Sequence, residues 1–557
     1  MRLRVRGLRL PLNHEFADIL KAAAIRIEQP LDMVGGLKLI RKSVDARRNE
    51  VYFTYTVEID LPDHIDIKPQ ILDSPDLSIK IPAEPVILKS GNMDLPWSPL
   101  ICGLGPAGLF AALRLARSGY KPVVIEQGQD IDRRVPAVET FWQGGEFNPY
   151  SNAQFGEGGA GTFSDGKLTT RSGDEHVNYV LQTMVNYGAD EEILYLKKPH
   201  VGTDIIRQVV KGIRREIIEL GGEVYFDARL TDLSINQTGI KRIIINNQLE
   251  LPCSLLVLAV GHSARPLYQL LYDKGVKMLP KAFAIGVRIE HPQRFIDQLQ
   301  YGEYAGHPQL GAADYHMTYQ DSLTGRALYT FCMCPGGYVI AAASEPGQAV
   351  TNGMSYLARN SGVANSALVV TVTPADWDYS TLGGVQLQQF LERKAFAMGG
   401  NTYHAPAQRV EDYLNKRISD DLTNTLASYK PGVTPANLWY ILPYDTAGVL
   451  ERGLKYWNRK MPGFIHPQAV LTAIETRTSA PLRIERNSEM VSVNVPNLYP
   501  CGEGAGYAGG IVSAAVDGLK IAEKIICTYR LPDNKLTIVD SEVTDARTLN
   551  GIQVQPL

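Results

Sequence analysis

A glycine-rich turn between two apolar segments constrains this chain more than any other feature. Residues 99–102 lead into Gly103-Leu104-Gly105-Pro106-Ala107-Gly108, and a second apolar run, 122–125, ends at Glu126. The stretch between them has an apolar helical stripe, formed by Leu109, Phe110, Leu113, Leu115 and Ala116, and a stop at Gly119. This order predicts a strand, a helix and a parallel strand, the βαβ unit that binds nucleotides.

Each conspicuous residue of this unit has a physical role. Gly103 permits a tight turn, Gly105 lets the backbone approach a pyrophosphate, and Gly108 lets the helix pack closely on the sheet. The helix N-terminus favours a phosphate, because its first N–H groups are unpaired and the helix dipole is positive there. We expect Glu126 to accept both hydroxyls of an adenosine ribose.

The whole chain has an ordinary globular composition. Its 557 residues are 45% hydrophobic and 21% charged with a net charge of -3, so no strong charge imbalance points to a polyanionic partner. The charged N-terminus MRLRVRGLRL does not resemble a secretory signal, and no apolar run approaches the roughly 18 residues of a spanning helix. Six cysteines do not resemble a disulfide framework. We therefore expect a cytoplasmic protein without a membrane partner.

The order of patterns predicts an α/β fold with three parts. A Rossmann-like, doubly wound FAD-binding domain is interrupted by an inserted β-rich substrate domain and preceded by a small α+β domain. The predicted boundaries are 1–90 for the N-terminal domain, 95–280 and 466–535 for the two parts of the FAD-binding domain, 281–465 for the insertion and 536–557 for a C-terminal tail. Residues 1–50 contain eleven Lys or Arg and six Asp or Glu, which indicates either a solvated face or an anionic partner.

Three further segments favour FAD over NAD as the resident dinucleotide. Glu126-Gln127-Gly128 is followed by Arg133 and Arg134, which can return toward the phosphates. The buried strand 255–260 ends in a turn containing Gly261 and Ser263, and a late strand and turn carry Gly502 and Glu503 before a helix that begins near Gly510 and Ile511. In flavoproteins an acid in such a late turn binds the ribityl chain, whereas an NAD dehydrogenase does not need this element.

The loop 154–168 contains a second glycine-rich run. Gly158, Gly159, Ala160 and Gly161 offer exposed N–H groups and room for a flat ring, so we assign this run to the flavin pyrophosphate and the edge of the isoalloxazine. A flexible surface loop is the alternative. Lys167 is a candidate cation near the flavin, where it would stabilise the reduced anion, or else a surface lysine.

Several long strings extend these motifs into a family resemblance. They are 41–48, 154–168, 283–291, 331–337 and 502–511. On these residues the chain resembles the bacterial FAD-dependent dehydrogenase family, a group of NAD(P)/FAD-dependent oxidoreductases within the glutathione-reductase-like flavoprotein superfamily. The resemblance implies an FAD fold but no particular substrate. Glu503 stands where that superfamily usually has Asp, and both acids accept the same hydrogen bonds.

Candidate catalytic residues have competing interpretations. Cys332 and Cys334 form a CxC that indicates dithiol redox chemistry, a substrate-pocket lining or buried structural cysteines. Arg477 indicates either bidentate binding of a substrate carboxylate or a structural ion pair. Four histidines are candidate proton donors or satisfied hydrogen-bonding groups: His262, His316, His404 and His466. No cysteine or histidine cluster has zinc-finger spacing.

These features predict an FAD-dependent oxidoreductase that transfers a hydride between the flavin and a small organic substrate. No second nucleotide motif is present, so NAD(P)H enters only as a transient co-substrate. Two alternatives remain: a flavin monooxygenase, and an FAD-bearing protein that binds or modifies RNA through its basic N-terminal domain. The chain lacks the WxWxIP segment of flavin halogenases, and we do not expect a nucleic-acid partner.

Overall fold

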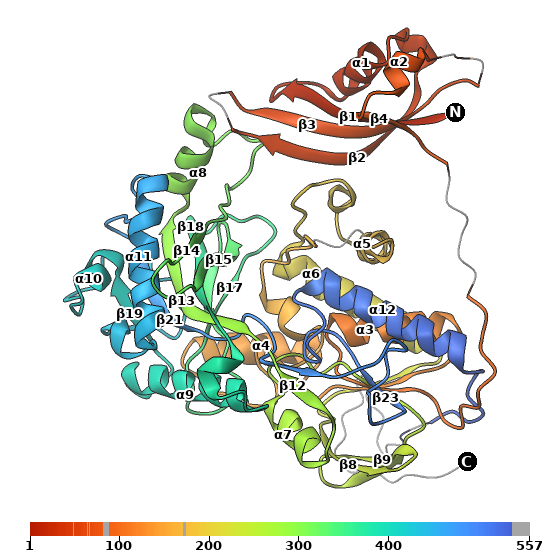
Figure 1. Cartoon of the computed structure of the whole chain (residues 1–557), viewed down its shortest axis with the longest axis vertical. Coiled ribbons are helices and arrows are strands. Elements are labelled where there is room, and N and C mark those ends of the chain that lie inside the picture. The colour runs from red at the N-terminus through yellow and green to blue at the C-terminus, as the bar shows by residue number, and fades with distance from the viewer. Residues whose placement is uncertain are drawn as a thin grey trace.

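The computed structural model describes residues 1–47, 50–63, 65, 67–81, 88–170, 174–536 and 538. Figure 1 shows an N-terminal unit, a unit built on a parallel sheet and a third unit built on a larger sheet. The proposed C-terminal tail, 536–557, lies outside the described residues except for 536 and 538.

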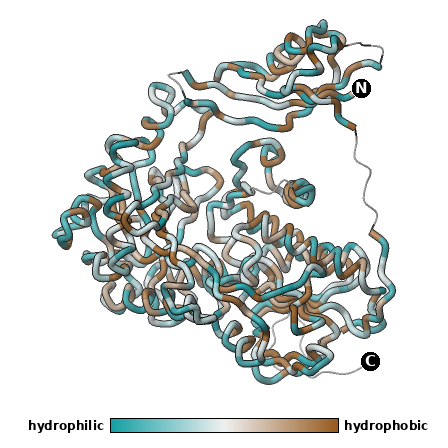
Figure 2. Tube along the Cα trace, in the orientation of Figure 1, coloured by the Kyte–Doolittle hydropathy of each residue, from teal (hydrophilic) through white to brown (hydrophobic). Residues whose placement is uncertain are grey.

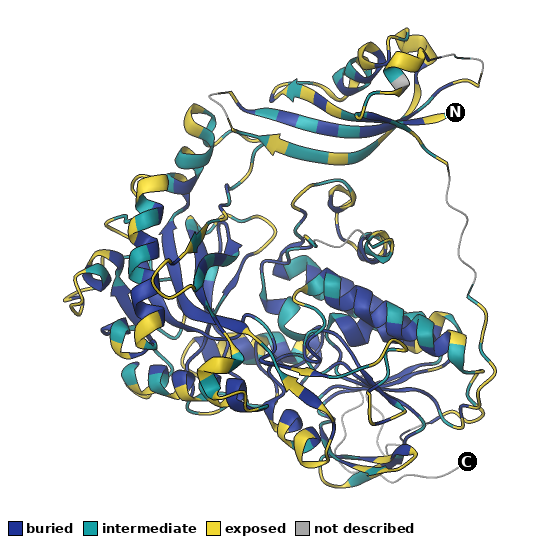
Figure 3. Cartoon of the chain, in the orientation of Figure 1, coloured by how far each residue is buried: buried dark blue, intermediate teal, exposed yellow. Residues whose placement is uncertain are grey.

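The N-terminal unit is a four-stranded antiparallel sheet with helices on one side, as the sequence pattern predicts. Its strands lie in the order β2-β3-β1-β4. The elements are β1 (Arg2–Pro11), α1 (Phe16–Arg26), β2 (Gly35–Asp45), β3 (Tyr52–Asp60), α2 (Pro69–Leu72) and β4 (Leu77–Ile79). Burial alternates along β1 and β3 (Figure 3), because successive side chains of a strand point to opposite faces.

Part of the positive charge of this unit is neutralised by ion pairs within it. Four arginines form ion pairs with acids of the same unit: Arg2 with Asp60, Arg4 with Glu58, Arg26 with Asp76 and Arg47 with Asp45. These contacts favour the solvated-face interpretation of the positive charge over an anionic partner.

The second unit contains the five-stranded parallel sheet expected around the glycine-rich turn. The strand order is β23-β11-β5-β6-β7, and every neighbouring pair is parallel. The strands are β5 (Leu100–Cys102), β6 (Val123–Ile125), β7 (Glu223–Tyr225), β11 (Leu256–Leu258) and β23 (Leu498–Pro500). Each of these short strands is fully buried, as parallel strands covered on both faces are; Figure 2 shows hydrophobic residues gathered along them.

The two faces of the parallel sheet are covered differently. One face packs against α3 (Pro106–Arg117), α5 (His176–Asn186), α6 (Gly202–Glu219) and α12 (Ile511–Thr528). The other packs against the antiparallel strands β8 (Leu230–Asn236), β9 (Gly239–Ile245) and β10 (Leu249–Pro252), with α7 (Arg265–Asp273) beside them. The doubly wound prediction is therefore wrong for this face, because a β-meander takes the place of a helical layer.

The third unit is a seven-stranded sheet, ordered β14-β15-β18-β13-β21-β19-β20. The strands are β13 (Phe283–Pro292), β14 (Thr318–Gln320), β15 (Ala327–Cys334), β18 (Val363–Val372), β19 (Ala405–Arg409), β20 (Val433–Pro435) and β21 (Val470–Glu475). The helices are α8 (Gln293–Tyr301), α9 (Gly383–Met398), α10 (Val410–Leu414) and α11 (Tyr444–Lys460). Because β21 pairs with β13, this sheet extends past the boundary expected at residue 465.

Shorter elements complete the units. Two small antiparallel pairs are β12 (Met278–Pro280) with β22 (Leu482–Ile484), and β16 (Tyr338–Ala341) with β17 (Thr351–Met354). The helix α4 (Ile131–Trp142) follows β6. The N-terminal unit contacts the parallel-sheet unit where Lys42 bridges to Leu196. Within the described residues, no helix combines the length and apolar character needed to cross a membrane.

Candidate functional site

A pocket of about 700 Å³ opens at the carboxyl ends of the parallel strands. Cys102, Ile125, Ala259 and Cys501, which end or directly follow β5, β6, β11 and β23, line it. Ligands of open α/β sheets bind at this edge. The opposite wall comes from the large-sheet unit and includes Phe331, so the pocket lies between the two units.

Two helix N-termini meet at this pocket. Gly105, Pro106 and Ala107 line it at the start of α3, and Gly510 and Ile511 line it at the start of α12. Neither helix has an acidic residue in its first turn, so no carboxylate of its own neutralises the positive end of the dipole. The arrangement suits the two negative charges of a pyrophosphate.

The glycines of the first turn have the predicted geometry. Gly103 has a φ of 100°, and a Cβ there would lie 2.4 Å from the Ala259 carbonyl oxygen. A Cβ at Gly108 would lie 1.9 Å from the Gly103 carbonyl oxygen, so this glycine allows close packing and does not itself line the pocket. A Cβ at Gly105 would meet only the Gly159 Cα, at 3.9 Å, which leaves the space beside it for a ligand.

Glu126 lies buried in the pocket wall and already accepts three backbone hydrogen bonds. Its Oε2 accepts from the Leu104 N–H at 2.8 Å, and its Oε1 accepts from the N–H groups of Gly128 and Gly156, both at 3.0 Å. A carboxylate has about four acceptor positions, so one position on Oε2 remains for a ribose hydroxyl. The expectation that Glu126 accepts both hydroxyls is therefore corrected to one.

The second glycine-rich loop also reaches the pocket. Gly159, Ala160 and Gly161 line it. Gly158 does not, because it faces Thr162 and Val210 on the far side of the loop.

Two of the glycines expected to bind the cofactor, Gly128 and Gly502, lie behind the pocket lining. Gly128 packs on Gly156, and Gly502 packs on Ala107, so the lack of a side chain allows close contact between segments. Gln127, Gly261 and Ser263 do line the pocket.

The predicted phosphate contacts of Arg133 and Arg134 are not made. Arg133 forms ion pairs with Asp130 at 2.5 Å and with Asp227 at 2.9 Å. Arg134 is fully buried and donates to the carbonyl oxygens of Asn152 and Glu157 and to the Thr162 hydroxyl. The Arg134 guanidinium holds the glycine-rich loop 154–168, the Arg133 guanidinium joins the start of α4 to Asp227, and neither lines the pocket.

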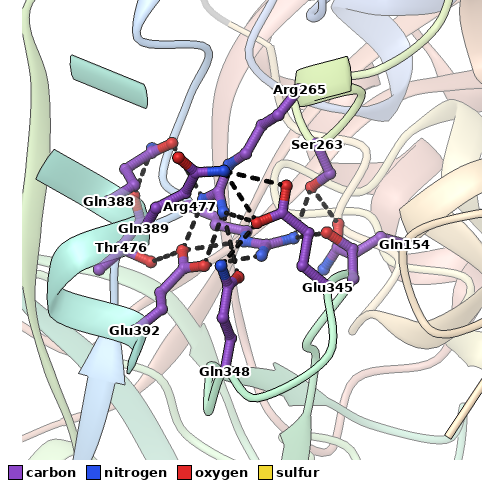
Figure 4. A network of polar contacts seen from close by, with 11 residues as sticks. Gln154, Ser263, Arg265, Glu345, Gln348, Gln388, Gln389, Glu392, Thr476 and Arg477 are labelled. Carbon is purple, nitrogen blue, oxygen red and sulfur yellow. Dashed lines mark hydrogen bonds and ion pairs between the residues drawn. The ribbon is translucent and has the colours of Figure 1, made fainter. Parts of the chain in front are cut away.

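Arg477 lines the pocket but is held in a buried polar network (Figure 4). Its Nε and Nη2 donate to the Glu392 carboxylate at 3.1 and 2.9 Å, and its Nη1 donates to the Ser263 hydroxyl at 3.0 Å. Glu392 also accepts two hydrogen bonds from Arg265, at 2.7 and 2.8 Å. This geometry supports the structural ion pair and leaves no bidentate face for a substrate carboxylate.

Glu503 and His262 lie together in the lining. The Glu503 Oε1 is 3.6 Å from the His262 Nδ1. Burial raises the pKa of Glu503 to about 7, and Lys281 opposes the shift. Burial, with Arg477 and Arg265 nearby, lowers the pKa of His262 to about 3. The imidazole is therefore neutral, and its buried Nε2 has no hydrogen-bond partner among the described residues, so it is available to a ligand.

The remaining candidate residues divide between the pocket and its surroundings. Lys167 lines the pocket and donates to the Met333 carbonyl oxygen. Cys332 lines the pocket, whereas Cys334 is buried behind it. Three of the histidines lie elsewhere: His316, His404 and His466.

One end of the lining contains residues that sequence patterns did not indicate. Pro149, Tyr150, Ala228, Arg229 and Leu230 lie in the same pocket, where the Ala228 N–H donates to the Glu126 carbonyl oxygen at 2.9 Å. The Arg229 guanidinium stacks 4.4 Å from the centre of the Tyr150 ring. A flat adenine suits such a surface. Residues 149–154 and 228–230 are loop segments without a repeated spacing, so only the folded chain brings them together.

Comparison with known proteins identifies the family. The profile described as "FAD-dependent protein, C-terminal domain-like" matches residues 282–478, and a domain of unknown function matches residues 2–60. An uncharacterized protein of Clostridium beijerinckii is 46% identical over 534 residues, which cover 96% of this chain and 100% of the relative. The chain belongs to the family of this clostridial protein. The profile match supports an FAD-dependent protein.

Solved structures give only weak likenesses. Glycine oxidase from Bacillus cereus is 10% identical, with a TM-score of 0.32 over 77% of this chain and 96% of the oxidase. A halogenase is 11% identical, with a TM-score of 0.35 over 77% of this chain and 67% of the halogenase. Scores this low say nothing about the activity of this family member.

The residues present fit FAD. The acid-free helix N-termini suit its pyrophosphate, the free acceptor of Glu126 suits its ribose, and the pocket continues to the large-sheet wall. When bound, the flavin supplies two-electron chemistry. With FAD bound, Glu126 would orient the adenosine end, Glu503 would offer an acceptor to the ribityl chain, and the wall from the large-sheet unit would shield the reacting end from water.

Proposed function

We propose that this protein is an FAD-dependent dehydrogenase or reductase that transfers a hydride between its flavin and a small organic substrate. In this proposal the parallel-sheet unit is a Rossmann-like FAD-binding domain, related to the glutathione-reductase-like flavoproteins, and the large-sheet unit is the substrate domain. The observation that carries the proposal is the single pocket shared by the phosphate-type turn at Gly103–Gly108 and the polar wall around Cys332 and Glu475.

NAD(P)H enters this proposal only as a transient electron donor. The Gly103–Gly108 turn opens the pocket assigned to FAD, and the pocket provides no second turn of that kind among its lining residues. A pyridine nucleotide would therefore approach the flavin from the substrate side and leave after reduction.

The proposal is tested by reducing the purified holoprotein without oxygen and mixing it with a panel of small carbonyl, enone and imine compounds. Reoxidation of the flavin by one class, with stoichiometric reduced product, supports hydride transfer. Reoxidation by oxygen alone, with an oxygenated organic product, refutes it and identifies a monooxygenase. Parallel mixing with NADH and NADPH measures each nucleotide as donor.

A variant locates the substrate end of the pocket. Phe331 lines the pocket from β15, and Tyr329 lies two residues earlier on the same strand without lining it. We expect Phe331→Ala to change the KM or the range of accepted compounds at unchanged flavin content, and Tyr329→Ala to leave both unaltered. Equal effects of the two substitutions would remove Phe331 from the substrate site.

A further inference from the structure

Cys332 occupies an irregular point of the large sheet that faces the pocket. The register of β15 against β18 shifts between Phe331 and Cys334, so Cys332 and Met333 form a β-bulge, and Cys334 pairs with Asn365 directly after it. Cys332 has a φ of 43°, in the left-handed region that residues other than glycine rarely adopt. Bulges beside active sites re-aim side chains. This one directs Cys332 to the lining while Cys334 stays buried.

Two cations donate hydrogen bonds to the backbone carbonyl groups of the bulge. Arg288 donates from Nη1 to the Cys332 carbonyl oxygen at 3.1 Å, and Lys167 donates to the carbonyl oxygen of Met333 between the two cysteines. Gly353 leaves the room that this requires, because a Cβ there would lie 2.2 Å from the Arg288 Nη1 and 2.7 Å from the Cys334 Sγ. The backbone that carries both thiols is therefore held in place.

The two thiols are also in contact with each other. Their side chains are close enough to share a hydrogen bond, and the single hydrogen of the Cys334 thiol also has the Cys332 carbonyl oxygen within reach, 3.2 Å from the Sγ. Alternate residues of a strand point to one face and their Cα atoms lie about 6.6 Å apart. That separation is just within the upper limit of about 6.8 Å for a disulfide.

The pair is chemically asymmetric. The hydrogen bond from Cys334 lowers the pKa of Cys332 to about 6; burial opposes this, and Lys167 and Arg288 reinforce it. The same hydrogen bond and burial raise the pKa of Cys334 well above its ordinary value. At neutral pH, one sulfur is a thiolate facing the pocket and the other is a protonated thiol behind it. A nucleophilic thiolate beside a protonated partner is the arrangement of a reactive dithiol.

We propose that Cys332 and Cys334 form a dithiol–disulfide couple that exchanges two electrons with the flavin of the same pocket. In the oxidative direction the Cys332 thiolate and the Cys334 thiol together lose two electrons and one proton as the S–S bond forms. A bound, oxidised flavin would take up both electrons and that proton. This inference rests on the proposed FAD function, and the flavin is the only co-reactant that the step requires.

The experiment is an anaerobic reductive titration of oxidised, desalted holoprotein with dithionite. We expect the wild type and Cys527→Ser, which removes the exposed thiol, to consume four electrons per flavin. Cys332→Ser and Cys334→Ser should each consume two. Consumption of two electrons by the wild type, or of four by Cys332→Ser or Cys334→Ser, would overturn the proposal.

A second readout needs no flavin and no activity. Oxidised and reduced samples of wild-type protein are alkylated under denaturing conditions, and the mass of the peptide that contains residues 332–334 is measured by mass spectrometry. We expect this peptide to resist alkylation after oxidation and to take two labels after reduction. Two labels in both samples would refute the couple even if neither serine variant folds. Absence of bound flavin would instead refute the proposed function, and the peptide mass would still test the thiol pair.

Discussion

The buried carboxylate of Glu392 offers the sharpest test of how the two large units are joined. It lies on α9 and accepts hydrogen bonds from Arg265 of the parallel-sheet unit, from Arg477 and from the Thr476 hydroxyl at 2.6 Å (Figure 4). Glu392→Gln keeps the size of the side chain but replaces one acceptor oxygen by a donor that faces guanidinium N–H groups. Two buried cations then lose their shared counterion.

The magnitude follows from the burial of this group. Breaking a buried ion pair by removing one partner costs about 3–5 kcal/mol. Glu345 is the matched control, because its side chain is 20% exposed and its contact with the Arg265 Nη1 is 3.3 Å. Glu345 bonds only one of the two guanidinium groups, and its other partners are the neutral amides of Gln348 and Gln389, so Glu345→Gln should cost less than Glu392→Gln.

The assay is denaturant unfolding of both variants, followed by tryptophan fluorescence and by flavin release. Burial raises the pKa of Glu392, but Arg265 and Arg477 together hold it below its ordinary value. A depressed carboxyl pKa stabilises the protein above the ordinary carboxyl pKa, and this contribution is lost as the pH falls below that value. The difference in free energy of unfolding between the wild type and Glu392→Gln should therefore decrease in acid. If the two variants lose amounts of unfolding free energy that differ by less than about 1 kcal/mol at pH 7, this account is refuted.

Three other outcomes are expected. Heat denaturation should release FAD and no FMN, as chromatography of the released flavin will show, because Glu126 and the first turn serve the adenosine half; stoichiometric FMN would contradict this. Gly105→Val should lose FAD by at least ten- to a hundredfold in Kd while the apoprotein keeps its unfolding midpoint, whereas Gly108→Ala should lower that midpoint because its Cβ has no room. Glu503→Gln should weaken FAD binding by roughly 1.5–3 kcal/mol at pH 8, with Asp restoring much of it. Because the pKa of Glu503 is raised to about 7, the affinity of the wild type for FAD should increase from pH 6 to pH 8, whereas that of the Gln variant should not change with pH in calorimetry. The same pH dependence of FAD affinity in both proteins would count against the assigned contact.

The parts of the molecule that sequence reasoning predicts best are determined by nearby residues. The strand, turn and helix from Leu100 to Arg117 depend on an apolar period, on glycines with special backbone geometry and on a close helix–sheet contact, all within one short segment. The N-terminal strands follow from alternation in the same way. Cover for the second face of the parallel sheet was mispredicted, because short strands such as those at 230–252 can form a meander or flank a helix with the same local pattern.

The side chains around the flavin end required the tertiary structure. The sequence left Arg477 open between binding a substrate carboxylate and forming a structural ion pair, because its partner Glu392 lies 85 residues away in sequence. Arg133 and Arg134 were misplaced for the same reason, because their acceptors come from separate loops. A charged residue near a ligand motif thus acquires its role from partners that local sequence does not reveal.

Cys332 shows how far this dependence goes. The CxC motif alone is consistent with a redox pair, a pocket lining or an inert core, and local sequence does not distinguish these. The distinction comes from Lys167, from Arg288 and from the register shift against β18, which belong to three distant segments. Because a strand without that shift would turn the side chain of Cys332 to another face, the bulge and its two cations are the physical reason why the motif faces the flavin pocket.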